Sequence, residues 1–209
     1  MKFDKEKMRL YAITDRHWLN GRSLKEVVKE SLDGGVTFLQ LRDKNSDDET
    51  FLQEAAELQE LCRDYKVPLI INDNVEIALK MNADGVHVGQ SDIKGRDIRA
   101  MIGPDKILGI SAGTVEEAQA AEKAGADYIG VGAVFGTSTK KNARNLSLEK
   151  LQEISSSGGS HWRNQCIQSD GACRQRSRRC SGGICHLCSQ GSRSGDQRAE
   201  SAGTENGGT

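Results

Sequence analysis

The sequence lacks a strong charge of either sign and lacks a long apolar run near its start. Its 29 Lys and Arg nearly cancel its 30 Asp and Glu, which leaves a formal net charge of -1. Without a basic or acidic surplus, nothing global predicts a nucleic-acid partner or a membrane surface. Residues 1–11 are too polar for a signal peptide or a membrane span. We therefore expect a cytoplasmic protein with small-molecule partners, no nucleic acid and no membrane, and we predict no oligomeric state.

Large apolar residues are scarce in the last part of the chain. Beyond Ser157 the only Val, Ile, Leu, Met or Phe are Ile167, Ile184 and Leu187. A segment rich in Gly, Ser, Arg and Gln buries too little apolar surface to offset its chain entropy. The 209 residues also suit a single domain. We predict one incomplete domain over residues 1–157 and an aberrant, disordered tail over residues 158–209.

Six short apolar runs bounded by turn residues are typical of buried parallel strands. They cover residues 10–13, 38–41, 69–71, 85–88, 107–110 and 128–131. Helical patterns lie between them, and capping boxes are predicted to start at Ser23, Ser46 and Thr114. One helical face is expected to carry Phe51, Ala55, Leu58 and Cys62.

The alternation of strand and helix predicts a parallel α/β architecture. Six such units suit a (β/α)8 TIM barrel that is truncated before its last quarter, with a doubly wound sheet as the alternative. Residues 82–88 and 125–131 echo each other, and both enter a strand from a helix. The barrel is favoured because polar residues follow several different strands, where the loops of a barrel form its active site.

The second strand is followed by the stretch Gln40-Leu41-Arg42-Asp43-Lys44. It sets an amide and two cations at the strand's end, and such cations can clamp a phosphate or pyrophosphate. The alternative is a solvated loop.

Two aspartates follow the next two strands. Asp73 lies between Asn72 and Asn74, and Asp92 ends the stretch Gly89-Gln90-Ser91-Asp92. Together with phosphate oxygens and water, two such carboxylates suit Mg²⁺, a hard cation that prefers oxygen ligands. Taken singly, Asp73 could be a helix cap and Asp92 a turn residue.

Hydroxyl groups follow the fifth and sixth strands. Thr114 is explained as a helix cap, whereas Ser111 has no evident structural role and is free to bond a substrate oxygen. Thr137, Ser138, Thr139 and Lys140 offer hydroxyls, backbone N–H groups and a cation, which suit a phosphate. The spacing of Gly132 and Gly136 does not fit the P-loop of nucleotide hydrolases.

Taken in order, the motifs Q-L-R-D-K, I-N-D-N, G-V-H-V-G-Q-S-D, G-I-S and T-S-T-K resemble the pattern of thiamine phosphate synthases. The resemblance implies a (β/α)8 barrel that joins hydroxymethylpyrimidine pyrophosphate to a thiazole phosphate with the help of Mg²⁺. It also assigns roles. The pyrimidine and its pyrophosphate would be bound by Gln40, Leu41, Arg42, Asp43, Lys44 and Asn72. Asp73 and Asp92 would hold Mg²⁺, Ser111 and Lys140 would act on the pyrophosphate side as catalytic residues, and the thiazole phosphate would lie on Thr137, Ser138 and Thr139.

The tail departs from this pattern, which continues with a glycine-rich seventh strand and a Val-Ser contact after the eighth. Residues 158–164 can be encoded by GGT GGT AGC CAT TGG AGG AAT, and a start one base later gives V-V-A-I-G-G-I. The same shift lets residues 176–188 be encoded as G-A-D-G-V-A-V-V-S-A-I-F-A. Both missing motifs then return in order, so our hypothesis is a frameshift between Ser155 and Gly158. We expect open edges on the first and sixth strands, low stability and little synthase activity.

Three alternatives remain at this point. A thiazole tautomerase of the same barrel family would use a histidine near the fifth strand, where Ser111 is followed by no histidine; His87 is interpreted as a core residue. A zinc site could use Cys185 and Cys188 with Cys173 and Cys180, although their spacing is unusual. A nucleic-acid module could use the arginines of the tail, but no aromatic residue interleaves with them.

Overall fold

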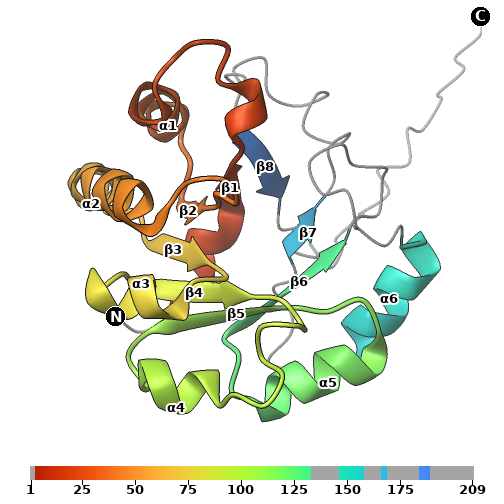
Figure 1. The fold of residues 1–209 in the computed structure, drawn as a ribbon. Helices are drawn as coiled ribbons and strands as arrows, with labels where there is room; N and C mark the ends of the chain where they lie inside the picture. The colour runs from red at the N-terminus through yellow and green to blue at the C-terminus, as the bar shows by residue number, and fades with distance from the viewer. Residues whose placement is uncertain (1–2, 133–145, 158–165, 169–183, 189–209) are drawn as a thin grey trace, which may run out of the picture.

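Six parallel strands and the helices outside them form most of the computed structural model, which describes residues 3–132, 146–157, 166–168 and 184–188 (Figure 1). Each of these strands pairs in parallel with the next one along the chain. The strands are β1 (Leu10–Thr14), β2 (Phe38–Leu41), β3 (Leu69–Asn72), β4 (Gly85–Val88), β5 (Ile107–Ser111) and β6 (Tyr128–Gly132). The predicted truncated (β/α)8 barrel is confirmed, and the doubly wound alternative is excluded because the strands follow one another in order around the barrel.

Helices cover the outer face of these strands (Figure 1). They are α1 (Leu24–Asp33), α2 (Asp48–Asp64), α3 (Val75–Lys80), α4 (Ile98–Ile102), α5 (Val115–Lys123) and α6 (Leu148–Ser157), while the short η1 (Lys5–Arg9) and η2 (Arg16–Trp18) lie directly before and after β1. No helix in the described ranges is long and apolar enough to cross a membrane.

The predicted helix starts are correct at two of three positions. Ser23 and Glu26 form a complete capping box, and Thr114 accepts a hydrogen bond from the Glu117 backbone N–H. The prediction of Ser46 is wrong, because Asp47 caps α2. Ser46 instead donates its hydroxyl hydrogen bond to the carboxylate of Asp43.

Two short strands from the tail close the barrel. Strand β7 (Cys166–Gln168) pairs in parallel with β6, and β8 (Ile184–Cys188) pairs antiparallel with both β7 and β1. The expectation of open edges on the first and sixth strands is therefore wrong. A parallel β8 would need a crossover, usually a helix, whereas residues 169–183 contain no Val, Ile, Leu, Met or Phe to form its apolar face. The remaining tail residues lie outside those that the structure describes.

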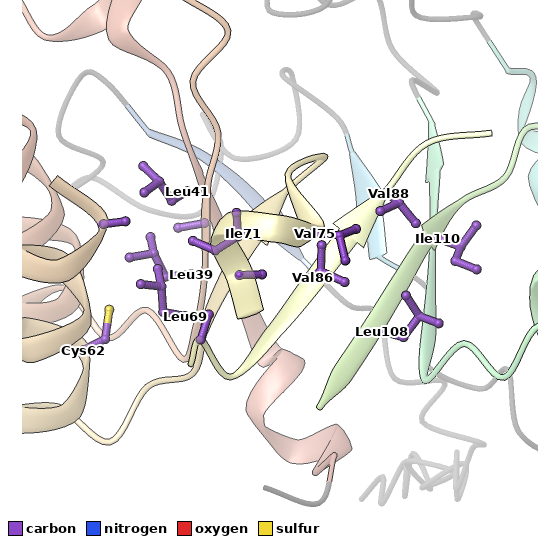
Figure 2. Packing of buried hydrophobic residues seen from close by; sticks show 14 of the residues in the cluster. Leu39, Leu41, Cys62, Leu69, Ile71, Val75, Val86, Val88, Leu108 and Ile110 are labelled. Atoms are coloured by element: carbon purple, nitrogen blue, oxygen red, sulfur yellow. The ribbon is translucent and has the colours of Figure 1, made fainter. Parts of the chain in front are cut away.

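Side chains alternate along each strand between an outer and an inner core. Figure 2 shows part of the outer core, in which Leu39, Ile71, Val86 and Leu108 face the helices together with Cys62 of α2. Phe51, Ala55 and Leu58 are buried on that face of α2 with Cys62, as predicted. Burying each large aliphatic side chain contributes about 1.5–3 kcal/mol, so this layer holds the helices to the barrel.

The inner core lies within the barrel and is rich in aromatic rings. It consists of Met8, Tyr11, Ile13, Phe38, Ile70, Ile107 and Tyr128. The rings of Tyr11 and Phe38 meet edge to face with centroids 4.7 Å apart, and Tyr128 packs edge to face on both. Such pairs stabilise beyond their buried area, and they fill the interior in the manner of a packed barrel.

The two echoing segments have the same structural role. Asp84 precedes β4 and accepts a hydrogen bond from the backbone N–H of Leu69, the first residue of β3. Asp127 precedes β6 and accepts one from the backbone N–H of Leu108 in β5, and Arg99 pairs with it at 2.7 Å. Each carboxylate thus fixes the start of the preceding strand, at the end of the barrel opposite to the candidate site.

Candidate functional site

The described candidate residues follow the carboxyl ends of four neighbouring strands. Arg42 and Lys44 follow β2, Asp73 follows β3, Asp92 lies in the turn after β4, and Ser111 ends β5. Because these strands are parallel, their carboxyl ends share one end of the barrel. The fold therefore brings the described part of the predicted site to one mouth, where the loops of a barrel form active sites.

The loop after β2 is fixed to β1 by a buried hydroxyl. The Thr14 hydroxyl accepts from the Arg42 backbone N–H at 2.9 Å and donates to the Arg42 carbonyl at 3.0 Å. Within the part of the chain that the structure describes, the Arg42 guanidinium has no ion-pair partner. The backbone of Arg42 is thus held in place while its cation remains available for an anion.

Asp43 organises this loop through its own carboxylate. It accepts hydrogen bonds from Arg16 Nε and Ser46 Oγ, both at 2.5 Å, and from the Asn45 backbone N–H at 2.9 Å. Arg16 also pairs with Glu54 of α2. Burial raises the pKa of Asp43, but these hydrogen bonds outweigh it and hold that pKa below its ordinary value. The carboxylate is therefore charged and already engaged on both oxygens.

Sequence reasoning did not identify Arg16. It lies 27 residues before Asp43, and only the parallel pairing of β1 with β2 brings the two loops together. No local spacing signals such a contact.

Gln40 and Leu41 point to opposite sides of β2. Gln40 is 2% exposed, and its amide Nε2 donates to the Tyr11 hydroxyl at 3.0 Å inside the barrel. Leu41 is fully buried in the outer core. Contact of Leu41 with a ligand at the mouth would therefore involve its backbone.

Asp73 and Asp92 lie on the loops that follow β3 and β4. Asp73 has the left-handed backbone angle φ of 63°, uncommon outside glycine, and its N–H donates to the His87 carbonyl at 2.8 Å. Its carboxylate lies 3.7 Å from Lys44 Nζ. Asn74, not Asp73, caps helix α3. Backbone that is held in this unusual conformation is found at ligand sites, where surrounding contacts enforce it.

The Asp92 carboxylate closes its own turn. One oxygen accepts from the Gly89 backbone N–H at 2.7 Å, and the other from Ser91 Oγ at 3.4 Å. Each oxygen keeps a further lone pair for a cation. Among the described residues no three His, Cys, Asp or Glu side chains form a metal cluster, so a cation here would need additional oxygen ligands from elsewhere.

Ser111 differs from the expectation that it has no structural role. Its hydroxyl lies 2.9 Å from His87 Nε2, and its carbonyl accepts from Gln90 Nε2 at 2.6 Å. His87 is 8% exposed and also contacts the Tyr128 hydroxyl through Nδ1 at 3.1 Å. The prediction of His87 as a buried residue is confirmed, but its ring nitrogens reach the site through Ser111.

The predicted Thr137, Ser138, Thr139 and Lys140 lie outside the described residues, as do Cys173 and Cys180 of the zinc alternative. Cys185 and Cys188 lie in strand β8. Cys62 is buried on the inner face of α2, and burial together with the charge of Asp84 raises the pKa of its thiol to about 12. Cys62 therefore remains a protonated thiol, which is a poor nucleophile.

Comparison with known proteins identifies relatives of most of the chain. A family profile described as "Thiamine monophosphate synthase" matches residues 10–162. Thiamine-phosphate synthase of Clostridium novyi is 53% identical over 147 residues, which cover 70% of this chain and 72% of the relative. That of Clostridioides difficile is 45% identical over 179 residues, which cover 80% of this chain and 85% of the relative. The solved thiamine phosphate pyrophosphorylase of Pyrococcus furiosus superposes with a TM-score of 0.65 at 36% identity and covers 79% of this chain and 74% of its own.

Proposed function

Because the chain belongs to the thiamine monophosphate synthase family, we propose that the mouth of its barrel binds hydroxymethylpyrimidine pyrophosphate and a thiazole phosphate and joins them. Thiamine-phosphate synthase activity in thiamine biosynthesis is the function of this family, and the named relatives favour it over the tautomerase alternative. The observation that carries the proposal is the gathering of Arg42, Lys44, Asp73, Asp92 and Ser111 at one end of four parallel strands. The reaction is expected to take place in the cytoplasm.

The polar residues divide between the two ends of a pyrimidine pyrophosphate. Gln40 and Asn72 offer amide groups, which suit a ring with an amino group and nitrogen acceptors. Arg42, Lys44 and Lys140 offer cations, which suit the pyrophosphate. Ser111 adds a hydroxyl on the pyrophosphate side, and Thr137, Ser138 and Thr139 would bind the thiazole phosphate. Asp43 orders the loop of Arg42 and Lys44 through Arg16.

Asp73 and Asp92 are proposed to hold Mg²⁺. Both are carboxylates, the hard oxygen ligands that Mg²⁺ prefers, and this cation ordinarily keeps waters and substrate oxygens as its other ligands. The absence of a third acidic or histidine ligand among the described residues fits such a shared site. When bound, the cation would help to neutralise the charge of the pyrophosphate.

The chemistry needs no protein nucleophile. The bond between the pyrimidine methylene carbon and the pyrophosphate oxygen breaks, and its electron pair leaves with pyrophosphate. Arg42, Lys44 and Lys140 stabilise the departing charge, as fixed cations do most effectively where charge develops. The thiazole nitrogen then donates its lone pair to the methylene carbon and forms the new C–N bond. The chain's other task is to hold both substrates in line and to exclude water, which would otherwise capture the carbon.

Calorimetric titration of the full chain with hydroxymethylpyrimidine pyrophosphate, with and without Mg²⁺, tests this assignment. Lys44→Ala is expected to weaken binding about tenfold, since a charge-assisted contact contributes about 1.5–3 kcal/mol at most and Lys44 is half exposed. Lys25→Ala is the matched control, because Lys25 is 55% exposed against 54% for Lys44 and lies 3.9 Å from Glu57. Equal effects of the two variants, or an affinity that is the same with and without Mg²⁺, would contradict the assignment.

We further propose that residues 1–157 are the synthase domain and that residues 158–209 result from a shift of reading frame. The family match ends at residue 162, close to the proposed break. A chain that lacks the glycine-rich loop and the Val-Ser contact of the family is expected to have little activity. Sequencing the gene around codon 157 decides this point, since the hypothesis fails if no downstream frame encodes the two missing strings.

A further inference from the structure

A continuous chain of hydrogen bonds crosses the barrel interior beneath the candidate site. Gln40 Nε2 donates to the Tyr11 hydroxyl at 3.0 Å, and this hydroxyl lies 2.7 Å from that of Tyr128. The Tyr128 hydroxyl lies 3.1 Å from His87 Nδ1, and His87 Nε2 lies 2.9 Å from Ser111 Oγ. The two ends of the chain, Gln40 and Ser111, are both proposed substrate contacts. The three residues between them are not.

Two glycines make room for this chain. His87, Gly109 and Tyr128 are side by side in register on β4, β5 and β6. A Cβ added at Gly109 would overlap the Tyr128 ring, its hydroxyl and His87 Nδ1. A Cβ at Gly130 would lie 2.9 Å from His87 Cε1, which is closer than real Cβ atoms approach their neighbours. The absence of both side chains therefore lets His87 reach across β5 to Tyr128.

Because these side chains are buried, the loss of any one of these hydrogen bonds would be costly. Tyr128 is fully buried, Tyr11 is 1% exposed and His87 is 8% exposed. A buried polar group that loses its partner is left without the water that would replace it, so the interior favours the bonded arrangement. Chains of such bonds also polarise one another in a low dielectric.

The amide at one end gives the chain a direction. An amide nitrogen only donates, so the Tyr11 oxygen accepts from Gln40 and its own hydrogen can pass to Tyr128. With Tyr11 donating to Tyr128, Tyr128 would donate to His87 Nδ1, and a neutral imidazole would then carry its hydrogen on Nε2, toward Ser111 Oγ. The Ser111 hydroxyl hydrogen is then directed to another acceptor, and Gln40 keeps its carbonyl oxygen as an acceptor.

We propose that Tyr11, Tyr128 and His87 are positioning residues that fix Gln40 as an acceptor and Ser111 as a donor toward the pyrimidine pyrophosphate. The identity of the ligand rests on the proposed function, whereas the direction of the hydrogen bonds rests on their geometry alone. A carbonyl acceptor suits the amino group of the pyrimidine, and a hydroxyl donor suits a pyrophosphate oxygen. A substrate bond to Gln40 and another to Ser111 would thus use groups that the barrel interior has already oriented.

Nitrogen-15 NMR of the full-length protein with labelled histidine tests the direction of the hydrogen bonds without any substrate. The chain contains four histidines, and the spectrum of His87→Gln assigns the signal of His87. We expect hydrogen on Nε2 and none on Nδ1, with a gain of the Nδ1-protonated form in Tyr128→Phe. Tyr65→Phe is the matched control, because Tyr65 donates to Asp33 on the outer surface and should leave the signal unchanged. A wild-type imidazole with hydrogen on Nδ1 would overturn the proposal, and reading it requires no substrate and no variant beyond the one used for assignment.

A double-mutant cycle tests the effect on binding. Tyr128→Phe is expected to weaken binding of hydroxymethylpyrimidine pyrophosphate about five- to tenfold in the otherwise intact chain, which is the usual size of one net hydrogen bond. In a Ser111→Ala background the same change is expected to cost less than in the intact protein, because one of its two routes to the ligand is then cut and only the route through Tyr11 and Gln40 remains. Equal losses in both backgrounds would overturn the positioning role. Absence of any binding would count against the proposed function, while the nitrogen signals would still decide the direction of the hydrogen bonds.

Discussion

The carboxylate of Asp43 is expected to stabilise the barrel mouth through its charge, which Asp43→Asn removes. The Asp43 side chain is 2% exposed and accepts from three donors, one of them the Arg16 guanidinium. Breaking a buried pair costs about 3–5 kcal/mol. Arg16 is 31% exposed and keeps Glu54, which reduces the expected loss to about 2 kcal/mol.

Urea denaturation of the full chain at pH 7 and at pH 3 measures this loss. The pKa of Asp43 is lowered in the folded chain, so its stabilisation is present above the ordinary pKa of about 3.9 and is lost as the pH falls through the folded value. The difference between wild type and Asp43→Asn should therefore shrink in acid. Glu30→Gln is the control, because Glu30 forms a single 2.8 Å pair with Arg22 and is 52% exposed, which predicts less than about 1 kcal/mol. A loss for Asp43→Asn no larger than that control, or one unchanged at pH 3, would refute the reasoning.

Three further outcomes are expected from the fold. Gly85→Ala should lower the free energy of unfolding by about 1–3 kcal/mol in urea titration, because its Cβ would overlap the Ile107 backbone carbonyl and Cβ; a smaller loss would show that β4 and β5 can separate. Ser23→Ala should cost about 1 kcal/mol in the same assay by removing the cap of α1, and an unchanged midpoint would contradict the capping box. Cys62 should resist alkylation at pH 8 in the folded chain and react after unfolding, which a thiol titration measures, since its pKa is raised to about 12.

Most of the fold could be predicted because its signals are local. The six apolar runs match the six parallel strands to within one residue at each end, since strands buried on both faces read as continuous apolar segments. The start of α2 was missed by one position because Ser46 and Asp47 are both good caps. The choice depends on Asp43, three residues before Ser46, which accepts the Ser46 hydroxyl and is itself held by Arg16. Strand β8 was missed because its pairing with β1 joins distant segments of unusual composition.

The position of the candidate site could also be predicted, but its supporting contacts could not. Parallel strands bring the ends of β2 to β5 together, so Lys44 and Asp73 were expected at one mouth. The bond between His87 and Ser111 depends on the alternation of β4 and on the gap at Gly109. Both features need the register of three strands, which no spacing within one segment reveals.

The carboxylates of Asp84 and Asp127 suggest what the shifted frame would restore. Each carboxylate holds the first residues of the preceding strand, at the end of the barrel opposite to the candidate site. Each also belongs to one of the two echoing segments, which end in a strand. The string G-A-D-G-V-A-V-V contains a third aspartate at the same place in the echo. Read in that frame, the chain would gain a third aspartate to hold the start of its seventh strand. Its last strand would then begin at the end of the barrel opposite to the candidate site and run parallel to β1. The one-base shift that changes the loops at the mouth would then also determine whether the last strand closes the barrel parallel or antiparallel to β1.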